Sequence, residues 1–135
     1  MTPGDIVLIR FPRTNLQAGK LRPALVVALV PGRHNDWLLA AISSRLYQAI
    51  TGLDEVIYPT DADFSQTRLR VASVIRASRL ATVQDSVFDA RLGRLSTERL
   101  HRVRAQIAGW LQAPPVSQRM SVVREASEEW GLPSR

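Results

Sequence analysis

Cysteine is absent from this chain of 135 residues, and aromatic residues make up only 6% of it. Without cysteine, the chain can form neither disulfide bonds nor thiolate metal sites, and it cannot use a cysteine nucleophile. The scarcity of aromatic side chains predicts a core of leucine, valine, isoleucine and alanine. Hydrophobic residues still amount to 45%, which is enough for one modest core and indicates a single domain.

Secretion signals and long apolar segments are also missing. The N-terminus, MTPGDIVLIRF, has no basic region followed by a long apolar run, so we expect no signal peptide. The longest apolar stretch lies within residues 23–31 and is too short to span a bilayer. A reducing compartment suits a chain without cysteine, and we therefore expect a cytoplasmic protein with no membrane partner.

Recognisable sites for metals, cofactors and covalent catalysis are equally scarce. The two histidines, His34 and His101, have no second ligand at a metal-binding spacing. The sequence contains no glycine-rich phosphate loop, and no serine lies in a nucleophile elbow. We therefore expect neither a metal nor a cofactor.

Acidic residues are outnumbered by basic ones, 12 against 18, which gives a net charge of +6, and Lys20 is the only lysine. Guanidinium groups bind phosphate oxygens in a forked geometry, so this composition favours a polyanionic partner. A GC-rich genome would produce the same arginine bias, and composition alone leaves both explanations open. Clustering is more informative, because residues 64–79 contain four arginines and no acid.

Short apolar segments separated by turns dominate the first two thirds of the chain. They predict strands at residues 5–11, 23–30, 37–43, 55–58, 69–76 and 77–84. From Ser96, the expected N-cap, apolar residues recur every three to four positions and predict a helix that ends before Pro114. This order favours a mainly β fold, a small antiparallel sheet or barrel with a C-terminal helix. We expect one domain at residues 1–112 and a partly helical extension at residues 113–135.

A basic element, GKLRP at residues 19–23, stands directly before a predicted buried strand. Pro23 biases Arg22 toward an extended conformation. A guanidinium held at a rigid strand end is a good anchor for a phosphate. The same pattern also fits a loop arginine that packs on its own strand, and the pattern does not separate the two.

Several segments resemble the MazF/PemK toxin family in order and spacing. They are GDIV at residues 4–7, QAGKLRPALVV at residues 17–27, AAISS at residues 40–44, ASVI at residues 72–75 and SRLATV at residues 78–83. The likeness extends over about residues 3–111. It implies an SH3-like β-barrel, usually a homodimer, which cleaves single-stranded RNA without a metal and is blocked by a cognate antitoxin. By position, it also implies Arg22 and Ser43 as catalytic residues.

The family reaction is attack of the 2′-hydroxyl on the adjacent phosphorus, which gives a 2′,3′-cyclic phosphate and a 5′-hydroxyl. Arg22 can stabilise the charged phosphorane and donate a proton to the leaving 5′-oxygen, since a guanidinium is a poor base. Ser43 can donate a hydrogen bond to a nonbridging oxygen. Because the reaction needs the 2′-hydroxyl, we expect DNA to remain uncut.

One position departs from the family pattern: Leu16 stands where many members have a glutamate. A carboxylate that would accept the 2′-hydroxyl proton is therefore missing. Asp5 and Asp36 are candidate substitutes, and the sequence favours neither. The departure is compatible with slower cleavage, with a different base or with no catalysis.

Binding of RNA needs contacts beyond the scissile phosphate. Tyr47 can stack on a base, whereas we expect Trp37 to pack in the core. Arg68 and Arg70 can follow the RNA backbone. The predicted RNA-binding residues are Phe11, Gln17, Lys20, Ser44, Arg45, Arg76 and Arg79. A further set, Arg91, Arg94, Arg99, Arg102 and Arg104, is expected on the solvated face of the C-terminal helix.

Two other functions remain open. The first is a module of the same fold that binds RNA or a protein without cutting, which Leu16 keeps in consideration. The second is a toxin of this fold directed at DNA gyrase, which would not need the pair of Arg22 and Ser43. The Arg-Pro-Ala-Leu-Val element at residues 22–26 argues against it.

Overall fold

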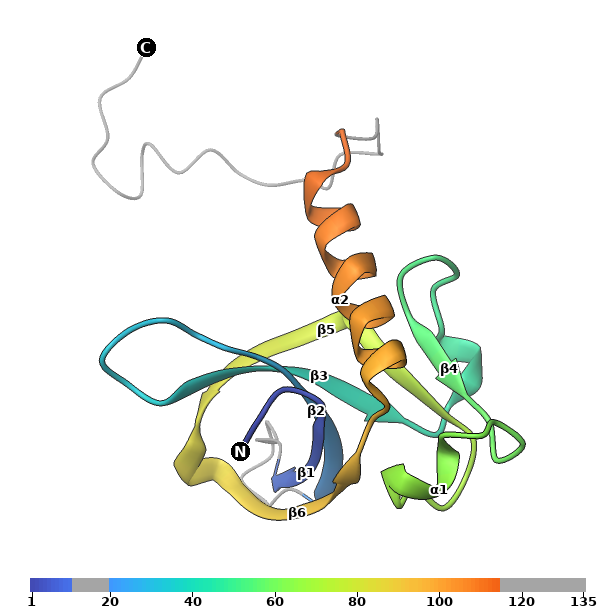
Figure 1. Ribbon diagram of the computed structural model, residues 1–135, viewed down its shortest axis with the longest axis horizontal. Helices are drawn as coiled ribbons and strands as arrows, with labels where there is room; N and C mark the ends of the chain where they lie inside the picture. The colour runs from blue at the N-terminus through green and yellow to red at the C-terminus, as the bar shows by residue number, and fades with distance from the viewer. Residues whose placement is uncertain (11–19, 115–135) are drawn as a thin grey trace, which may run out of the picture.

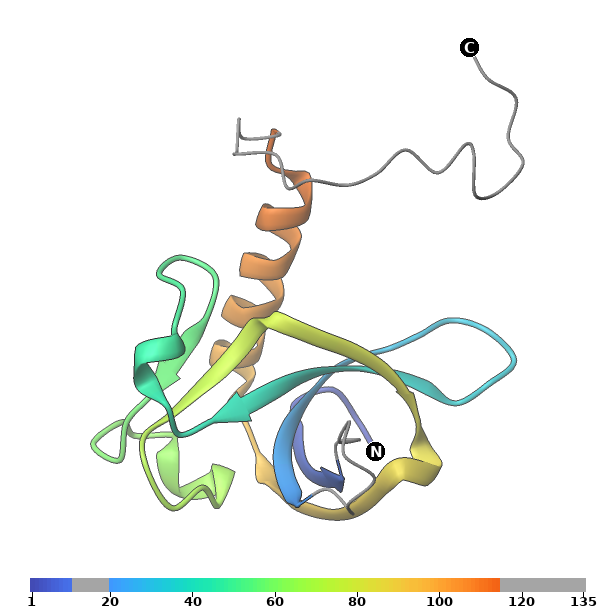
Figure 2. The ribbon, with the colours of Figure 1, turned by 180° about the vertical axis from the view of Figure 1, so that it is seen from behind.

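The computed structural model describes residues 1–10 and 20–114, and its framework is one antiparallel sheet of six strands (Figure 1). The strands are β1 (Asp5–Arg10), β2 (Leu21–Leu29), β3 (Asp36–Ser43), β4 (Glu55–Ile57), β5 (Ser73–Gln84) and β6 (Phe88–Arg94). Their order across the sheet is β4-β5-β3-β2-β1-β6. The sheet curls strongly, as Figure 2 shows from behind, but the edge strands β4 and β6 do not pair, so it stays open. The expected mainly β fold is confirmed.

Helix α2 (Thr97–Gln112) begins directly after the predicted N-cap. The Ser96 hydroxyl accepts a hydrogen bond from the backbone N–H of Arg99 at 3.2 Å, which stabilises the first turn. Shorter helical segments are α1 (Phe64–Thr67), η1 (Leu46–Gln48) and η2 (Asp85–Val87). No helix in the described ranges is long and apolar enough to cross a membrane. The helix expected in the tail lies outside the described residues.

The two predicted strands at 69–76 and 77–84 correspond to one strand, β5, which begins only at Ser73. Ala40 pairs with Leu80 and Ala41 pairs with Arg76, so residues 77–79 have no partners opposite them on β3. This bulge breaks the alternation of buried and exposed side chains, which is why the sequence pattern suggested two strands.

Strand β6 was missed by the sequence analysis. Its segment, FDARLGR, is mostly exposed, carries three charged residues and has a single buried residue, Gly93. An edge strand that pairs only with β1 needs no apolar alternation. A Cβ on Gly93 would lie 2.3 Å from the carbonyl oxygen of Thr67, so glycine permits the close approach of α1 to β6.

The two faces of the sheet bury separate apolar clusters. One face packs against α2 through Leu100, Val103 and Ile107, which follow the predicted helical spacing. The other cluster comprises Val7, Ile9, Ala24, Val26, Trp37 and Leu39. The expected core position of Trp37 is confirmed, because only 8% of this residue is exposed.

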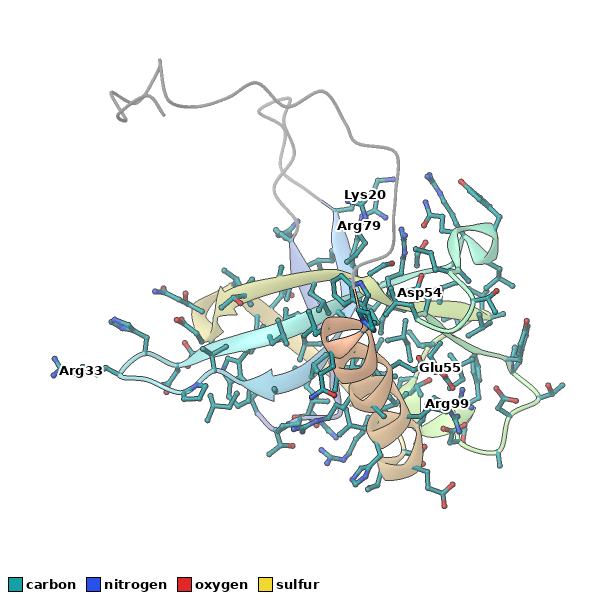
Figure 3. The ribbon with its side chains drawn as sticks, turned by 90° about the horizontal axis from the view of Figure 1, so that it is seen from above. Lys20, Arg33, Asp54, Glu55, Arg79 and Arg99 are labelled. Carbon is teal, nitrogen blue, oxygen red and sulfur yellow. The ribbon has the colours of Figure 1, made fainter. Side chains whose placement is uncertain are left out.

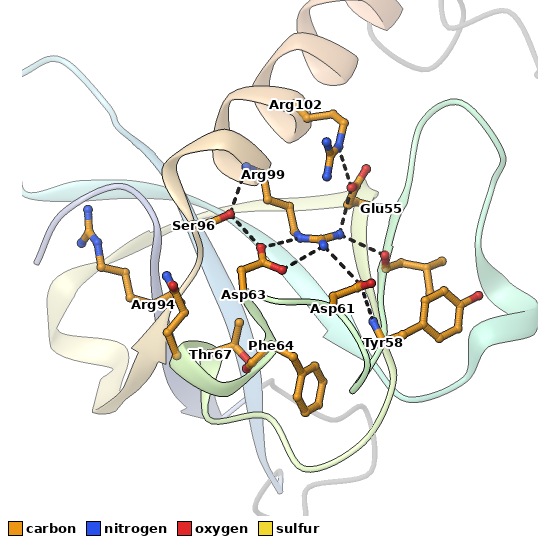
Figure 4. A network of polar contacts seen from close by, with 12 residues as sticks. Glu55, Tyr58, Asp61, Asp63, Phe64, Thr67, Arg94, Ser96, Arg99 and Arg102 are labelled. Atoms are coloured by element: carbon orange, nitrogen blue, oxygen red, sulfur yellow. Dashed lines mark hydrogen bonds and ion pairs between the residues drawn. The ribbon is translucent and has the colours of Figure 1, made fainter.

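Arg99 is the main correction to the predicted solvated arginines, because it is only 8% exposed. Its guanidinium donates two hydrogen bonds to Asp63, at 2.9 and 3.0 Å, and one each to Glu55 and Asp61, at 3.1 and 3.2 Å (Figure 4). This network ties α2 to β4 and to the segment before α1. Two others of the set, Arg91 and Arg94, are exposed as expected, but they lie on β6 before the helix and pair with Asp5.

The hydrogen bonds from Arg99 lower the pKa of Asp63 from its ordinary value of 3.8 to about 2. A carboxyl whose pKa is depressed in the folded state stabilises the protein above its unfolded pKa and loses that effect as the pH falls toward 2. We expect Asp63→Asn to lower the free energy of unfolding by about 2 kcal/mol at pH 6. Urea unfolding of both proteins between pH 6 and pH 2 measures this effect. The difference between their free energies of unfolding should shrink toward zero as the pH falls. A difference that is independent of pH would contradict this prediction.

Candidate functional site

Two adjoining cavities open where β2 begins and β3 ends. The first has a volume of about 580 Å³ and the second about 490 Å³. They share four lining residues, Arg22, Ile42, Ser43 and Arg45. We call the two together the cationic groove. In Figure 3, Lys20 and Arg79, which line the first and second cavity respectively, lie away from Arg33 at the tip of the β2–β3 hairpin.

Arg22 and Ser43 come from neighbouring antiparallel strands. Ala24 on β2 pairs with Ala41 on β3, and continuing this register by two residues places Arg22 opposite Ser43. Directly opposed residues on antiparallel strands have Cβ atoms about 5 Å apart. The sheet therefore brings together the two residues that the sequence resemblance named, although 20 residues separate them along the chain.

The hydroxyl of Ser43 is held by two hydrogen bonds. It donates to Oε1 of Gln48 at 3.2 Å and accepts from the backbone N–H of Arg45 at 3.1 Å. Gln48 lies in η1, directly after the turn that follows β3. Sequence reasoning missed Gln48, because only the return of the chain through η1 places its amide beside the strand end.

Among the described residues, the groove lining includes seven basic side chains and no carboxylate or imidazole. They are Lys20, Arg22, Arg45, Arg68, Arg70, Arg76 and Arg79. Within residues 1–10 and 20–114, only Arg76 of these seven has an acidic partner, Asp54 at 3.8 Å. The other six are exposed, so their positive charge stays available to an anion.

Arg68 occupies a conformation that is uncommon for a side chain other than glycine. It forms the C-cap of α1 with φ of 61°. The preceding Thr67 is fully buried and its hydroxyl donates to the carbonyl of Phe64 at 2.6 Å, which fixes the end of this helical turn. The cap turns the chain so that both Arg68 and Leu69 line the first cavity.

Most predicted RNA-binding residues gather in this groove. Lys20, Ser44 and Arg45 line the first cavity, and Arg45 also lines the second. Arg76 and Arg79 line the second cavity. The other two predicted contacts, Phe11 and Gln17, lie outside the described residues, as does Leu16. Tyr47 is 80% exposed but lines neither cavity.

Neither carboxylate suggested as a base lines the groove. Asp5 is buried and bonded to Arg91 at 3.1 Å and Arg94 at 2.8 Å. Burial raises the pKa of Asp5, but hydrogen bonds from Thr2 and the arginines outweigh burial and hold the pKa below its usual value. Asp36 is the first residue of β3, whereas Ser43 is the last, so the two lie at different ends of the strand. Among the described residues, no three histidine, aspartate or glutamate side chains gather as metal ligands.

Comparison with protein families identifies the chain. The family model of the PemK-like, MazF-like toxin of type II toxin-antitoxin systems matches residues 2–111. The chain belongs to this family. The match includes every strand of the sheet and nearly all of α2, so the groove lies wholly within the PemK-like region. Among curated protein sequences, none matches the chain.

Solved structures of MazF toxins share the PemK-like fold. The Mycobacterium tuberculosis toxin MazF-mt6 has 14% identity and a TM-score of 0.58, with coverage of 82% of this chain and 98% of that one. An endoribonuclease in complex with its cognate antitoxin, from a mycobacterial species, has 14% identity and a TM-score of 0.57, covering 86% and 99%. MazE-MazF from Deinococcus radiodurans has 20% identity and a TM-score of 0.57, covering 84% and 97%. At these identities the likeness concerns the fold.

Proposed function

We propose that the protein is a metal-independent endoribonuclease that cleaves single-stranded RNA, the toxin of a type II toxin–antitoxin pair. One observation carries the proposal: in a chain of this family, Arg22 stands opposite the hydroxyl of Ser43 in a groove lined by cations, and its guanidinium has no ion-pair partner among the described residues. The groove lies on the PemK-like sheet, and its charge suits the RNA backbone.

The chemistry is attack of the 2′-hydroxyl on the adjacent phosphorus, which forms the 2′,3′-cyclic phosphate and releases the 5′-oxygen. Arg22 binds two phosphorane oxygens through its fork and donates a proton to the leaving oxygen. Ser43 donates a hydrogen bond to a nonbridging oxygen once its proton turns from Gln48 to the substrate. Both groups stabilise charge that develops in the transition state.

The described residues that line the groove supply no carboxylate or imidazole to accept the 2′-hydroxyl proton. The sequence between β1 and β2, FPRTNLQAG at residues 11–19, contains no acid or histidine either. Catalysis then depends on electrostatic stabilisation, and we propose a slower enzyme than one with a positioned base. The same observation favours the alternative of a module that binds RNA without cutting it.

The partners and the domain limits follow from the family. We propose a homodimer in the cytoplasm, inhibited by an acidic segment of a cognate antitoxin that occupies the cationic groove. The relatives that were solved as a complex with an antitoxin and as MazE-MazF support such a partner. We assign residues 1–112 to the toxin domain, which the family match at residues 2–111 supports, and residues 113–135 to an extension.

A labelled single-stranded RNA pool incubated with the protein in EDTA tests the proposal. We expect cleavage products with a 2′,3′-cyclic phosphate and a 5′-hydroxyl, detected by end-group labelling and mass spectrometry. The same sequences made of DNA should remain intact, because DNA lacks the nucleophile. RNA that is bound but uncut would support the binding module instead, and inhibition of gyrase supercoiling would overturn both.

A further inference from the structure

The second cavity adjoins the proposed position of the scissile phosphate and has a different character from the first. Its volume of about 490 Å³ lies within the range of small-molecule sites. One part of its wall is apolar and consists of Ala41, Ile42, Leu80 and Ala81. All five cations that line the first cavity are exposed. The second cavity differs because one of its cations, Arg76, is largely buried. An apolar wall beside a fixed hydrogen-bond donor suits the planar ring of a nucleobase.

Arg76 is held rigidly, because only 14% of its side chain is exposed. Its Nη1 donates to Oε1 of Gln48 at 3.3 Å, and its Nη2 donates to the hydroxyl of Ser78 at 3.4 Å. A guanidinium has five N–H groups, so each terminal nitrogen keeps one N–H beyond these contacts. The same Gln48 oxygen accepts from Ser43, so one amide joins Arg76 to the proposed catalytic hydroxyl.

The carboxylate of Asp54 balances the charge of Arg76. The Asp54 side chain is fully buried, with one oxygen 3.8 Å from Nε of Arg76. It also accepts from the backbone N–H and the hydroxyl of Ser78, both at 3.0 Å, which secures the bulge of β5. The pair of Arg76 and Asp54 has no net charge, so the N–H groups of Arg76 suit a neutral acceptor better than a phosphate. The exposed cations of the groove suit the phosphates.

We propose that the second cavity binds a guanine of the substrate RNA next to the cleaved bond, with Arg76 donating to its O6 and N7 atoms; this inference rests on the proposed function. Guanine presents these two acceptors side by side, and arginine is their usual partner. Adenine places an amino donor where guanine has O6, so it would face an N–H of Arg76. Uracil carries its two carbonyl oxygens on either side of an N–H and offers no such pair.

Sequencing of the ends cut from a randomised RNA pool tests this inference. We expect guanine at one position next to the cut, enriched about tenfold or more over adenine. Arg76→Lys keeps the charge beside Asp54 but removes the fork, and it should reduce the enrichment below about threefold while the pool is still cut. Arg33→Lys, an equal change at an exposed arginine that lines neither cavity, should keep the enrichment. Cleavage without a guanine preference, or a preference that survives Arg76→Lys, would overturn the inference and leave the ribonuclease intact.

Binding of uncleavable RNA separates this inference from the proposed function. Tetranucleotides with 2′-O-methyl groups lack the nucleophile and stay uncut. Calorimetry can compare two of them that differ only in carrying guanine or adenine at the tested position. We expect wild type to bind the guanine form about tenfold more tightly, and Arg76→Lys to bind both forms alike. If wild type cuts no RNA but shows this preference, the cavity assignment holds and the enzyme proposal fails. Equal affinity of wild type for both forms would sink the assignment, whether or not the variant folds.

Discussion

Replacing Arg22 by alanine is expected to lower the single-turnover rate of RNA cleavage by about a thousandfold, because one preorganised donor to a developing anion contributes on this scale. Arg22 is exposed, stands at the mouth of β2 and has no ion-pair partner among the described residues. Its removal should therefore leave the sheet intact. Six other cations of the groove still attract the RNA backbone, so affinity for an uncleavable RNA should fall by about tenfold at most. Quenched-flow cleavage and fluorescence anisotropy measure the two effects separately.

Two variants control for charge and for geometry. Arg33→Ala removes an exposed arginine at the tip of the β2–β3 hairpin, far from the groove, and should cut at nearly the wild-type rate. Arg22→Lys keeps the charge but loses the fork, and we expect a loss of about a hundredfold. A rate for Arg22→Ala within about threefold of wild type would remove Arg22 from the reaction, since a stabilised phosphorane requires a larger effect.

Arg99→Met is expected to lower the free energy of unfolding by about 3–5 kcal/mol, which is the usual effect of breaking a buried ion pair. The substitution leaves the carboxylates of Glu55, Asp61 and Asp63 without the guanidinium that holds them together. The hydrogen bonds that Arg99 donates to Asp63, together with the negative charges of Asp63, Glu55 and Asp61, raise the pKa of Arg99, so the positive charge belongs to the folded state. We expect the melting temperature to fall by about 10–20 °C.

Arg102→Met is the matched control for this prediction. Arg102 lies on the same helix and also contacts Glu55, at 2.7 Å, but its side chain is 52% exposed. Such a surface pair contributes about 1 kcal/mol or less, so this variant should melt within a few degrees of wild type. Equal melting temperatures for the two variants would mean that the buried network does not stabilise the fold. The Arg99 variant should still cut RNA at low temperature, because Arg99 lines neither cavity of the groove.

Several parts of this molecule follow from short stretches of sequence. Pro23 predicted an extended Arg22 at the start of a buried strand, and Ser96 predicted the beginning of the last helix. Both depend on local backbone preferences, which the chain carries wherever it folds. The cluster of arginines at residues 64–79 was visible for the same reason, although only the fold aims its members at one groove.

The errors have physical causes of their own. Strand β6 is mostly exposed because it is an edge, so its sequence lacks the apolar alternation that marks a strand. The bulge of β5 breaks a period of two, so one strand was divided into two. Arg99 was placed in solvent because a helical arginine is exposed by default, and its three carboxylate partners lie between 36 and 44 residues earlier in the chain.

The sequence by itself determined most of the strands, the C-terminal helix, the positive charge and the presence of Arg22 at a strand end, because these depend on neighbouring residues and on composition. Only the tertiary structure decided which side chains meet in the groove. The register of β2 against β3 set Arg22 opposite Ser43, η1 returned Gln48 to the serine hydroxyl, and Asp54 secured the bulge that carries Arg79. The same packing kept Asp5 and Asp36 away. These contacts join residues from different segments of the chain. A pattern within one segment cannot predict them.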